Sequence, residues 1–578
     1  MTDPQVVLEQ RFSDAIVALG PDAAGADPVV RPSQRADYQV NGAMALGKRL
    51  GRSPREVADA LVATADLEGI AARVEVAGPG FINIDLSDEF LVRCLSDVRL
   101  PMRGVRQLKA PETVVIDYSA PNVAKEMHVG HLRSTVIGDA IARILEFVGD
   151  AVIRHNHLGD WGTPFGMLIE HLVDLGEQEA AAELSVGDLN TFYQDARKKF
   201  DADPSFAERA RQRVVKLQAG DPDTLAKWRL LVEQSEAYFS NIYERLGVTL
   251  TDDDYKGEST YNDELPSIVD ELRAKGLLVE DQGALCVFPP GFEGRDGEPL
   301  PVIVQKSDGG FGYAATDLAA IRHRIVELGA TWAIYVVGAP QAEHLAMVFE
   351  VARMAGWLVP PARAEHVAFG SVLGSDGKIF RTRSGESIKL ADLLDEAEAR
   401  ALEVVREKSP ELSEEEHRSI ARAVGIGAIK YADLSSDRVN DYVFDWDRML
   451  SFSGNTAPYL QGAHARVRSI FRKAGLNEPA ETDPVQVIIA HPAERALVRQ
   501  LLMFDGAVQA VLDSLKPHRL CTYLFELAQG FATFYEECPV LRAETEELRS
   551  SRLDLCDLTA RVMKTGLDLL GIPAPDRI

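Results

Sequence analysis

Residues 119–135 read SAPNVAKEMHVGHLRST, and this stretch decides the fold of the chain. A short apolar run at 113–117 comes directly before it, and apolar residues recur at helical spacing over 136–148. His128, Gly130 and His131 therefore lie at a strand-to-helix turn, where nucleotide phosphates bind. Two imidazoles separated by a glycine, which lets backbone approach a ligand, suit stabilising charge that develops on the α-phosphate of ATP.

The sequence after this helix continues the pattern. The stretch AVIRHNHLGDWG at 151–162 is typical of a second strand and its loop. A strand, a helix and a second strand predict a parallel sheet. Two histidines near a glycine are, by themselves, often ordinary surface or core residues. It is the position of this pair at the end of a predicted strand that indicates a nucleotide site.

Several further motifs follow along the chain. They are NHLGDWGTPFG at 156–166, GYAATDLAAI at 312–321, VGAPQAEH at 337–344, FGSVLGSDGKIFRTRSG at 369–385, NTAPYLQGAHAR at 455–466 and FYEECPVL at 534–541. Together with the stretch at 119–135, they give the chain a nearly full-length resemblance to the class I aminoacyl-tRNA synthetases. Within that class the chain resembles the arginyl-tRNA synthetases.

Composition agrees with a cytoplasmic enzyme of several domains. A chain of 578 residues is too long for one core and suggests about three or four domains. Its five cysteines form no C-x-x-C pair, so we expect neither a structural metal nor a disulfide framework. The first residues lack the pattern of a signal peptide, and no apolar run approaches the ~20 residues that span a membrane.

Charge is the one feature that argues against a nucleic-acid partner. A formal net charge of −27 repels a polyanion at long range. The charge is uneven, however, because residues 451–578 contain 14 basic and 16 acidic side chains. Binding of tRNA would therefore depend on local basic patches and on ionic strength.

We expect four parts. Residues 1–108 form a small α+β domain, and residues 109–400 form a Rossmann-like parallel-sheet catalytic domain. A helix-rich insertion at about 170–300 interrupts the catalytic domain; insertions of this kind lie outside the sheet. A helical connector at 401–450 leads to an all-α bundle at 451–578, where apolar residues recur at helical spacing.

The resemblance implies that both end domains contact tRNA. In the first domain, RADYQVNGAMALGK at 35–48 resembles the part that contacts the tRNA elbow, with Tyr38 and Gln39 as candidates. Alternatively, Tyr38 only caps a small core. In the last domain the candidates for single-stranded anticodon bases are the following residues: Tyr459, Gln461, His464 and Arg466. The family usually ends in methionine, whereas this chain ends in Ile578.

The loop GSDGKIFRTRSGES lies where class I enzymes carry a mobile lysine-rich motif, which is absent here. A glycine-rich basic loop containing Lys378, Arg381 and Arg383 can close over ATP and neutralise charge on pyrophosphate. A surface loop with three cations is otherwise only solvated. In arginyl enzymes a lysine just before the first histidine is thought to compensate for the missing motif, and here that residue is Lys125.

The arginine guanidinium requires a carboxylate in bidentate geometry. Tyr313 and Asp317 are four residues apart and can reach one pocket from one helix face. Alternatively, Asp317 caps its helix or pairs with Arg322. Positions that line the arginine pocket in the family match Asp117, Asn122, Tyr313, Asp317 and Gln341.

The resemblance also implies the reaction. The ATP contacts would be His128, Gly130, His131, Gly338, His344 and Val372. The arginine carboxylate would attack the α-phosphate of Mg²⁺-bound ATP, with His128, His131, Lys125, Lys378 and Arg381 as catalytic groups. Arginine would then pass from arginyl-adenylate to the 3′ end of tRNA(Arg). Arginyl enzymes require tRNA for the first step, and the family expectation is a monomer.

Two other classes of protein stay open. A small-molecule nucleotidyltransferase also uses the histidine turn but needs no helical C-terminal domain. A specialised or catalytically silent tRNA-binding paralogue would retain the fold. The silent form would be indicated by loss of a histidine of the turn or of a pocket carboxylate, and neither is lost here.

Overall fold

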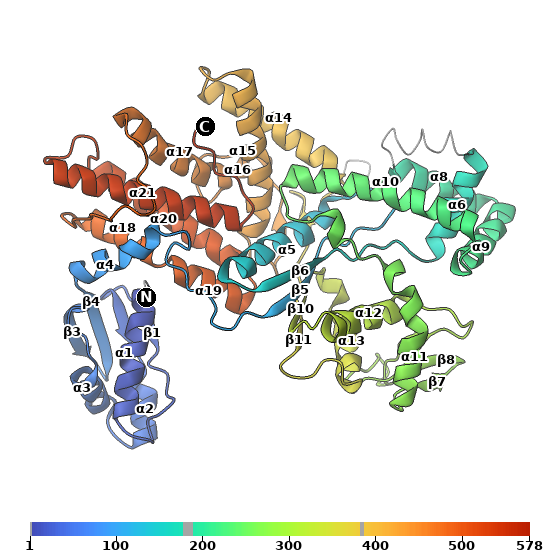
Figure 1. The fold of residues 1–578 in the computed structure, drawn as a ribbon, viewed down its shortest axis with the longest axis horizontal. Helices are drawn as coiled ribbons and strands as arrows, with labels where there is room; N and C mark the ends of the chain where they lie inside the picture. Colours follow the sequence, from blue (N-terminus) through green and yellow to red (C-terminus); the bar gives the residue numbers. More distant parts are fainter. Residues whose placement is uncertain (1–2, 177–188, 382–386) are drawn as a thin grey trace.

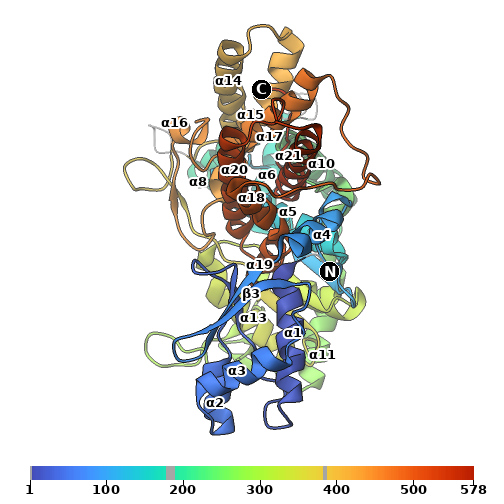
Figure 2. The same ribbon diagram turned by 90° about the vertical axis from the view of Figure 1, so that its left-hand side faces the viewer.

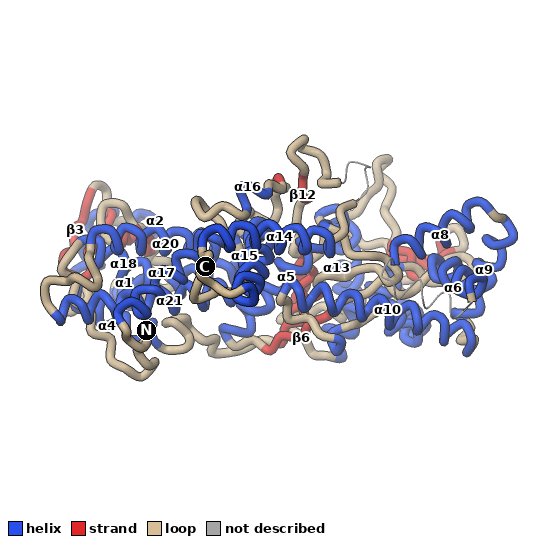
Figure 3. Tube along the Cα trace, turned by 90° about the horizontal axis from the view of Figure 1, so that it is seen from above, coloured by secondary structure: helices blue, strands red, loops and turns tan. Residues whose placement is uncertain are grey.

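The computed structural model describes residues 3–176, 189–381 and 387–578. The molecule is elongated, with the N-terminal unit at one end and the helical insertion at the other (Figures 1 and 3). A parallel sheet lies between them, and a bundle of helices packs beside it. The predicted fold class, a parallel-sheet catalytic domain with an α+β unit before it and an all-α unit after it, is confirmed.

The N-terminal unit is a four-stranded antiparallel sheet packed against helices (Figure 2). Its elements are α1 (Pro4–Ala18), β1 (Val30–Pro32), β2 (Tyr38–Val40), α2 (Ala43–Leu50), α3 (Pro54–Thr64), β3 (Ala71–Ala77), β4 (Phe81–Leu86) and α4 (Asp88–Arg99). Alternate residues of β4 are buried, which is the pattern of a strand with one face on a core.

The catalytic sheet has the strand order β11 (Arg363–His366), β10 (Trp332–Tyr335), β5 (Thr113–Asp117), β6 (Ala151–His155), and every pairing is parallel. β5 is an inner strand of the sheet and almost fully buried, as its apolar centre, residues 114–116, favours. Helix α5 (Val129–Val148) connects β5 to β6, so the predicted strand–helix–strand unit is confirmed. In the second half of the catalytic part, α12 (Tyr313–Arg322) continues into η3 (His323–Glu327) and then β10. After β10 the chain forms η4 (Ala339–Gln341) and α13 (Ala342–Met354).

The insertion has two kinds of structure. Its first part is helical: α6 (Thr163–Leu175), α8 (Leu189–Ala202), α9 (Pro204–Gln218) and α10 (Pro222–Leu246). Its second part contains η1 (Asp252–Asp254), η2 (Glu258–Glu264), α11 (Leu265–Ala274) and a three-stranded antiparallel sheet of β7 (Val279–Asp281), β8 (Ala284–Val287) and β9 (Val302–Gln305). The helix-rich expectation thus describes only the first part. The later strands are too short for a clear period of two.

The C-terminal part of the chain is helical. It comprises α14 (Leu390–Lys408), α15 (Glu414–Leu434), α16 (Trp446–Met449), α17 (Ala457–Ala474), α18 (Pro492–Leu502), α19 (Phe504–Ser514), α20 (His518–Glu537) and α21 (Glu546–Leu569). A short parallel pair, β12 (Val372–Leu373) with β13 (Tyr442–Val443), joins it to the catalytic part. Within the described ranges, no helix has the length and apolar character required to cross a membrane.

One buried ion pair fastens α5 to α15, and a buried lysine of α15 lies near α5. Arg133 on α5 is 1% exposed, and its Nε lies 3.1 Å from Oδ2 of Asp433, which is 0% exposed. Further along, Lys430 is also fully buried and donates from Nζ to the carbonyl of Leu246 at 2.9 Å. Burial lowers the pKa of Lys430 to about 8, and the nearby Asp139 carboxylate on α5 opposes this shift. The helix behind the histidine turn is therefore fixed to the C-terminal helices by charge as well as by packing.

Replacing Asp433 by Asn tests this connection. Arg133 would remain buried without its counterion, which typically costs about 3–5 kcal/mol. We expect a clear fall in the thermal midpoint, measured by calorimetry. The control is Arg197→Gln, which breaks a pair with Asp201 whose two side chains are each 55% exposed, and which should leave the midpoint unchanged. Equal midpoints for both variants would contradict the role of the buried pair.

Candidate active site

The turn between β5 and α5 has an unusual backbone. Three of its non-glycine residues have positive φ angles: Ser119 (74°), Ala120 (47°) and Ala124 (59°). Each of their N–H groups is bonded to a side chain from elsewhere, namely Ser134 Oγ on α5, Asn156 Oδ1 after β6 and Ser235 Oγ on α10, at 2.9 Å in every case. Such conformations persist only where the surroundings determine them, so the first part of the insertion supports the turn.

The two histidines of the turn cap α5 reciprocally. His128 is the N-cap residue, and its Nδ1 accepts the N–H of Gly130 at 3.0 Å. Nδ1 of His131 accepts the N–H of His128, also at 3.0 Å. Because both Nδ1 atoms accept, a neutral ring carries its proton on Nε2. The ring centroids are 4.1 Å apart, so two Nε2–H donors are presented side by side at the start of a helix.

The surroundings keep both rings neutral. Burial, with a contribution from the Lys125 charge, lowers the pKa of His128 below its ordinary value. Burial and the neighbouring His128 lower the pKa of His131 to about 3. The glycine between the rings is also required by space, since a Cβ on Gly130 would lie 2.8 Å from Cε1 of His128. The site thus offers uncharged donors of fixed direction.

The segment that follows the basic loop lies beside this turn. Lys378 and Arg381 are exposed on a hairpin after β12, in which Gly374 N–H bonds to the Lys378 carbonyl at 2.7 Å. The chain returns from the loop directly onto the turn, because Val129 N–H bonds to the carbonyl of Ile388 at 3.0 Å. Arg383 lies outside the described residues. The Nζ atom of Lys125 lies 4.3 Å from the centre of the Tyr193 ring, which belongs to α8 of the insertion.

The predicted arginine-binding residues surround the carboxyl ends of β5 and β10. Oδ2 of Asp317 accepts a hydrogen bond from Nε2 of His344 at 2.6 Å, and the rings of His344 and Tyr313 are 4.8 Å apart. Asp317 does not pair with Arg322 as the alternative proposed, because Arg322 bonds to Glu271 and Glu327 instead. Tyr313, Asp317 and His344 therefore form one cluster, in which Tyr313 is 67% exposed.

The other residues predicted to bind arginine or ATP lie on loops and strand ends of the catalytic part. Asn122 is exposed, and the chain at Asn122 forms a parallel bridge with Gly159. Gln341 closes η4 at the start of α13, and Gly338 precedes it in a bridge to Phe369. A fourth residue, Val372, is 4% exposed in β12.

Asp117 has a partner that the sequence analysis did not anticipate. Its Oδ2 accepts from Nη2 of Arg324 at 2.8 Å, and its Oδ1 has only a long contact, 3.4 Å, from the N–H of His157. Arg324 is 1% exposed and follows Asp317 by seven residues, across the change from α12 to the π-helical η3. No local pattern in the sequence specifies its pairing with Asp117.

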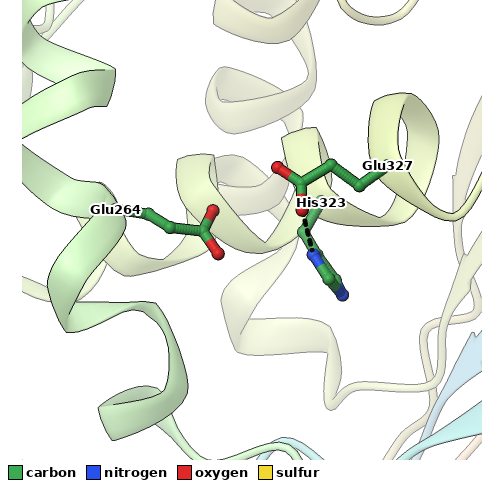
Figure 4. Close-up of side chains that lie close together, drawn as sticks. All are labelled: Glu264, His323 and Glu327. Atoms are coloured by element: carbon green, nitrogen blue, oxygen red, sulfur yellow. Dashed lines mark hydrogen bonds and ion pairs between the residues drawn. The ribbon is translucent and has the colours of Figure 1, made fainter.

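A small ionic cluster lies outside Arg324. Glu264, His323 and Glu327 have ligand atoms within 4.8 Å of one another (Figure 4). Nδ1 of His323 is 2.8 Å from Oε2 of Glu327, and Arg322 bonds to the other oxygen of that carboxylate at 2.6 Å. Glu327 therefore belongs to an ion-pair network on the surface of η3.

Three of the residues predicted to contact tRNA are buried in the structure. Tyr38 is 5% exposed in the core of the N-terminal sheet, a position that fits the alternative in which it caps a small core. Gln461 and His464 are both 0% exposed. Gln461 donates from Nε2 to the carbonyl of Pro573 at 2.8 Å, and His464 donates from Nδ1 to that of Pro575 at 3.2 Å. They hold the C-terminal tail.

The other residues predicted to contact tRNA are at least partly exposed to solvent. Gln39 is partly exposed and donates to Asn83 Oδ1 at 2.8 Å on the neighbouring strand β4. Tyr459 is partly exposed and packs against Phe525 with ring centroids 5.7 Å apart. Arg466 is exposed and lines an open cavity of about 790 Å³. The basic residues of that cavity are Lys408, Arg466, Arg472, Lys473 and Arg577, and Ile578 also lines it.

A histidine-capped turn at the carboxyl edge of a parallel sheet, followed by a helical C-terminal bundle, defines a class I aminoacyl-tRNA synthetase. Residues 98–446 match the family described as tRNA synthetases class I (R), catalytic domain. Residues 7–86 match the arginyl tRNA synthetase N terminal domain, and residues 460–578 match the DALR anticodon binding domain. The chain belongs to the arginyl-tRNA synthetase family.

Individual relatives are similar to this chain over nearly their whole length. The chain is 57% identical to the arginine–tRNA ligase of Thermobifida fusca, with 100% of both chains covered. It is 51% identical to the arginine–tRNA ligase of Klebsiella pneumoniae (strain 342), covering 99% of this chain and 100% of the relative. Among solved structures, Plasmodium falciparum arginyl-tRNA synthetase has a TM-score of 0.84 at 28% identity, with both chains fully covered. The Thermus thermophilus enzyme has a TM-score of 0.82 at 27% identity, covering 99% of this chain and 100% of that one.

The burial of His464 predicts an acid-dependent loss of stability. Burial, then the charge of Arg468, lowers the pKa of His464 to about 4. A lowered histidine pKa means that protons favour the unfolded chain, so this contribution is present above the unfolded pKa of about 6.5 and is lost as pH falls toward 4. His464→Gln should be less stable than the wild type near neutrality, and the gap should narrow by about 2 kcal/mol between about pH 7.5 and about pH 5.

The measurement is chemical unfolding of both proteins at the two pH values. His491→Gln is the control, because the side chain of His491 is 41% exposed. It should follow the wild-type pH profile. A constant gap between His464→Gln and the wild type would mean that His464 is not held neutral.

Proposed function

We propose that the chain is an arginine–tRNA ligase that converts L-arginine and ATP to arginyl-adenylate and pyrophosphate. It then transfers arginine to the 3′ end of tRNA(Arg) and releases AMP. The observation that carries the proposal is the full-length similarity to proteins named arginine–tRNA ligase, at up to 57% identity. The paired Nε2–H donors at the start of α5 supply the matching chemistry.

At the ATP end, His128 and His131 donate from Nε2 to the α-phosphate as negative charge grows on it, and Gly130 lets the phosphate approach. Because both rings are neutral, their contribution is directed hydrogen bonding rather than net charge. Positive charge comes from Lys125 and from Lys378 and Arg381 on the loop. The remaining ATP contacts assigned by the resemblance are Gly338, His344 and Val372. ATP enters as its Mg²⁺ complex, which neutralises part of the triphosphate.

At the arginine end, Asp317 and Asp117 are the carboxylates for the guanidinium. Oδ1 of Asp117 is the oxygen less engaged by the chain itself, since its contact with His157 is 3.4 Å. Tyr313 and Gln341 complete the pocket, and Asn122 binds the α-amino or carboxylate end. His344 is bonded to Asp317 at 2.6 Å, so it links the arginine pocket to the ATP site.

For tRNA, we propose that Gln39 contacts the elbow and that Tyr459 and Arg466 contact anticodon bases. The basic side chains around the cavity beside Arg466 support this role, since phosphate contacts fix the position of a nucleic acid and stacking adds affinity for single-stranded bases. The protein acts as a monomer in the cytoplasm. All five cysteines are free thiols, which suits a reducing compartment.

The deciding experiment is ATP–pyrophosphate exchange with every proteinogenic amino acid, run with and without bulk tRNA. We expect exchange with arginine alone, and only when tRNA is present. Exchange with a different amino acid would overturn the assignment of arginine. No exchange with any amino acid, in the presence of tRNA and alongside an active control enzyme, would favour a catalytically silent paralogue.

Gly130→Ala tests the histidine donors. The added Cβ would lie 2.8 Å from Cε1 of His128 and 2.9 Å from its Nδ1, so the ring must leave its capping position. We expect kcat for aminoacylation to fall on the order of 100-fold, as when one oriented donor is lost. The control is Gly530→Ala on α20, where a Cβ meets no atom within 4 Å. A Gly130→Ala enzyme with wild-type kcat would rule out this use of the rings.

A further inference from the structure

One guanidinium contacts the ends of three neighbouring strands of the catalytic sheet. Nη2 of Arg324 donates to Asp117 at the end of β5, and Nε donates to Nδ1 of His155 at the end of β6, at 3.3 Å. On the other side, Cζ of Arg324 lies 4.7 Å from the ring centre of Tyr335, the last residue of β10. Each of these partners is no more than 5% exposed.

Arg324 reaches this place because of the shape of its helix. α12 does not end in a regular turn but continues into η3, a π-helical turn over His323–Glu327. A π-helical turn changes the direction of the side chains that follow, and such turns are frequent at functional sites. Arg324 points inward, to Asp117 and His155, whereas His323 bonds to Glu327 (Figure 4 shows the second contact).

The contacts hold each partner in one state. A guanidinium that is 1% exposed must be paired, and the only carboxylate that it bonds in the described chain is Asp117. Burial, followed by the charge of Arg324, lowers the pKa of His155 to about 2, so His155 is neutral and its Nδ1 accepts. The His155 ring also stacks on His323 of the same π-helical turn, with ring centroids 6.3 Å apart.

We propose that Arg324 is a positioning residue that orients Asp117 and sets its distance from Asp317, and thereby determines specificity for the arginine guanidinium. This inference rests on the proposed function, since it concerns the same pocket. Asp317 lies on α12 and Asp117 on β5, and Arg324 is the described side chain of α12–η3 that bonds to Asp117. It therefore ties together the two elements that carry the pocket carboxylates.

The geometry also explains how the pocket could exclude lysine. Arg324 holds Oδ2 of Asp117, and Oδ1, which has only a 3.4 Å contact with the N–H of His157, is the oxygen that we assign to the substrate. A planar guanidinium has several donors in fixed positions and can meet two carboxylates held at a set separation, whereas an ammonium is a compact charge that meets both poorly. If Asp117 could turn freely, this difference between the substrates would diminish.

The test uses Arg324→Lys and Arg324→Gln in the full-length enzyme, with tRNA(Arg) transcript, ATP and either L-arginine or L-lysine. The matched control is Arg322→Gln, which removes an arginine from the same turn whose partners are Glu271 and Glu327 rather than Asp117. KM for arginine, KM for ATP and the ratio of kcat/KM for arginine over lysine are measured for each variant.

We expect KM for arginine to rise on the order of 10- to 100-fold in both Arg324 variants, as when a charged hydrogen bond is lost. KM for ATP should stay near the wild-type value, and the preference for arginine over lysine should fall. Arg322→Gln should retain all three values. A residue that only stabilises the fold would not separate the two KM values.

Arg324 has no positioning role if folded variants keep the wild-type KM for arginine, or if KM for arginine and for ATP rise together. The same conclusion follows if Arg322→Gln behaves like Arg324→Gln. Arg324→Lys retains a buried positive charge beside Asp117, so it gives a folded protein for the test should Arg324→Gln not fold. A wild-type enzyme that charges no arginine would instead refute the proposed function.

Discussion

The backbone between β5 and α5 is the constraint on which the rest of the structure depends. Its strained residues need hydrogen-bond partners that the turn itself cannot supply. The partners come from α5, from the segment after β6 and from α10 of the insertion. The insertion is therefore part of the site's framework, and the two histidines that cap α5 keep their directions only while those parts remain docked.

Charge is distributed so that this framework is rigid although the protein is strongly acidic. The net charge is −27, yet the ion pair between Arg133 of α5 and Asp433 of α15 is buried, and Arg324 is buried against Asp117. Removing one partner from such a pair is far more costly than removing an exposed ion pair. The surface acidity is thus compatible with an interior in which basic side chains fix the relative positions of helices and sheet.

Sequence patterns predicted the fold better than they predicted individual contacts. The apolar run of β5, the helical spacing of α5 and the helical C-terminal part are periodic features, and each is present in the structure. The position of the basic loop in the chain, by contrast, could be predicted from its composition, but the direction in which its side chains point could not. The resemblance to the family makes Tyr38, Gln461 and His464 candidates for tRNA contacts, yet all three are buried in the structure. Residue type indicates which chemistry is possible, whereas burial depends on which elements pack over the residue.

The sequence by itself determined that a strand, a histidine turn and a helix form part of a parallel sheet unit, and it predicted a nucleotide site there, because these features are local in the chain. Tertiary structure decided the pairings between distant segments. Asp117 bonds to Arg324, Asp317 bonds to His344, and His464 holds the C-terminal tail rather than a base. These contacts join residues separated by 27 to 207 positions. No local pattern specifies such pairings, because they arise only when the sheet, the π-helical turn and the helices have packed together.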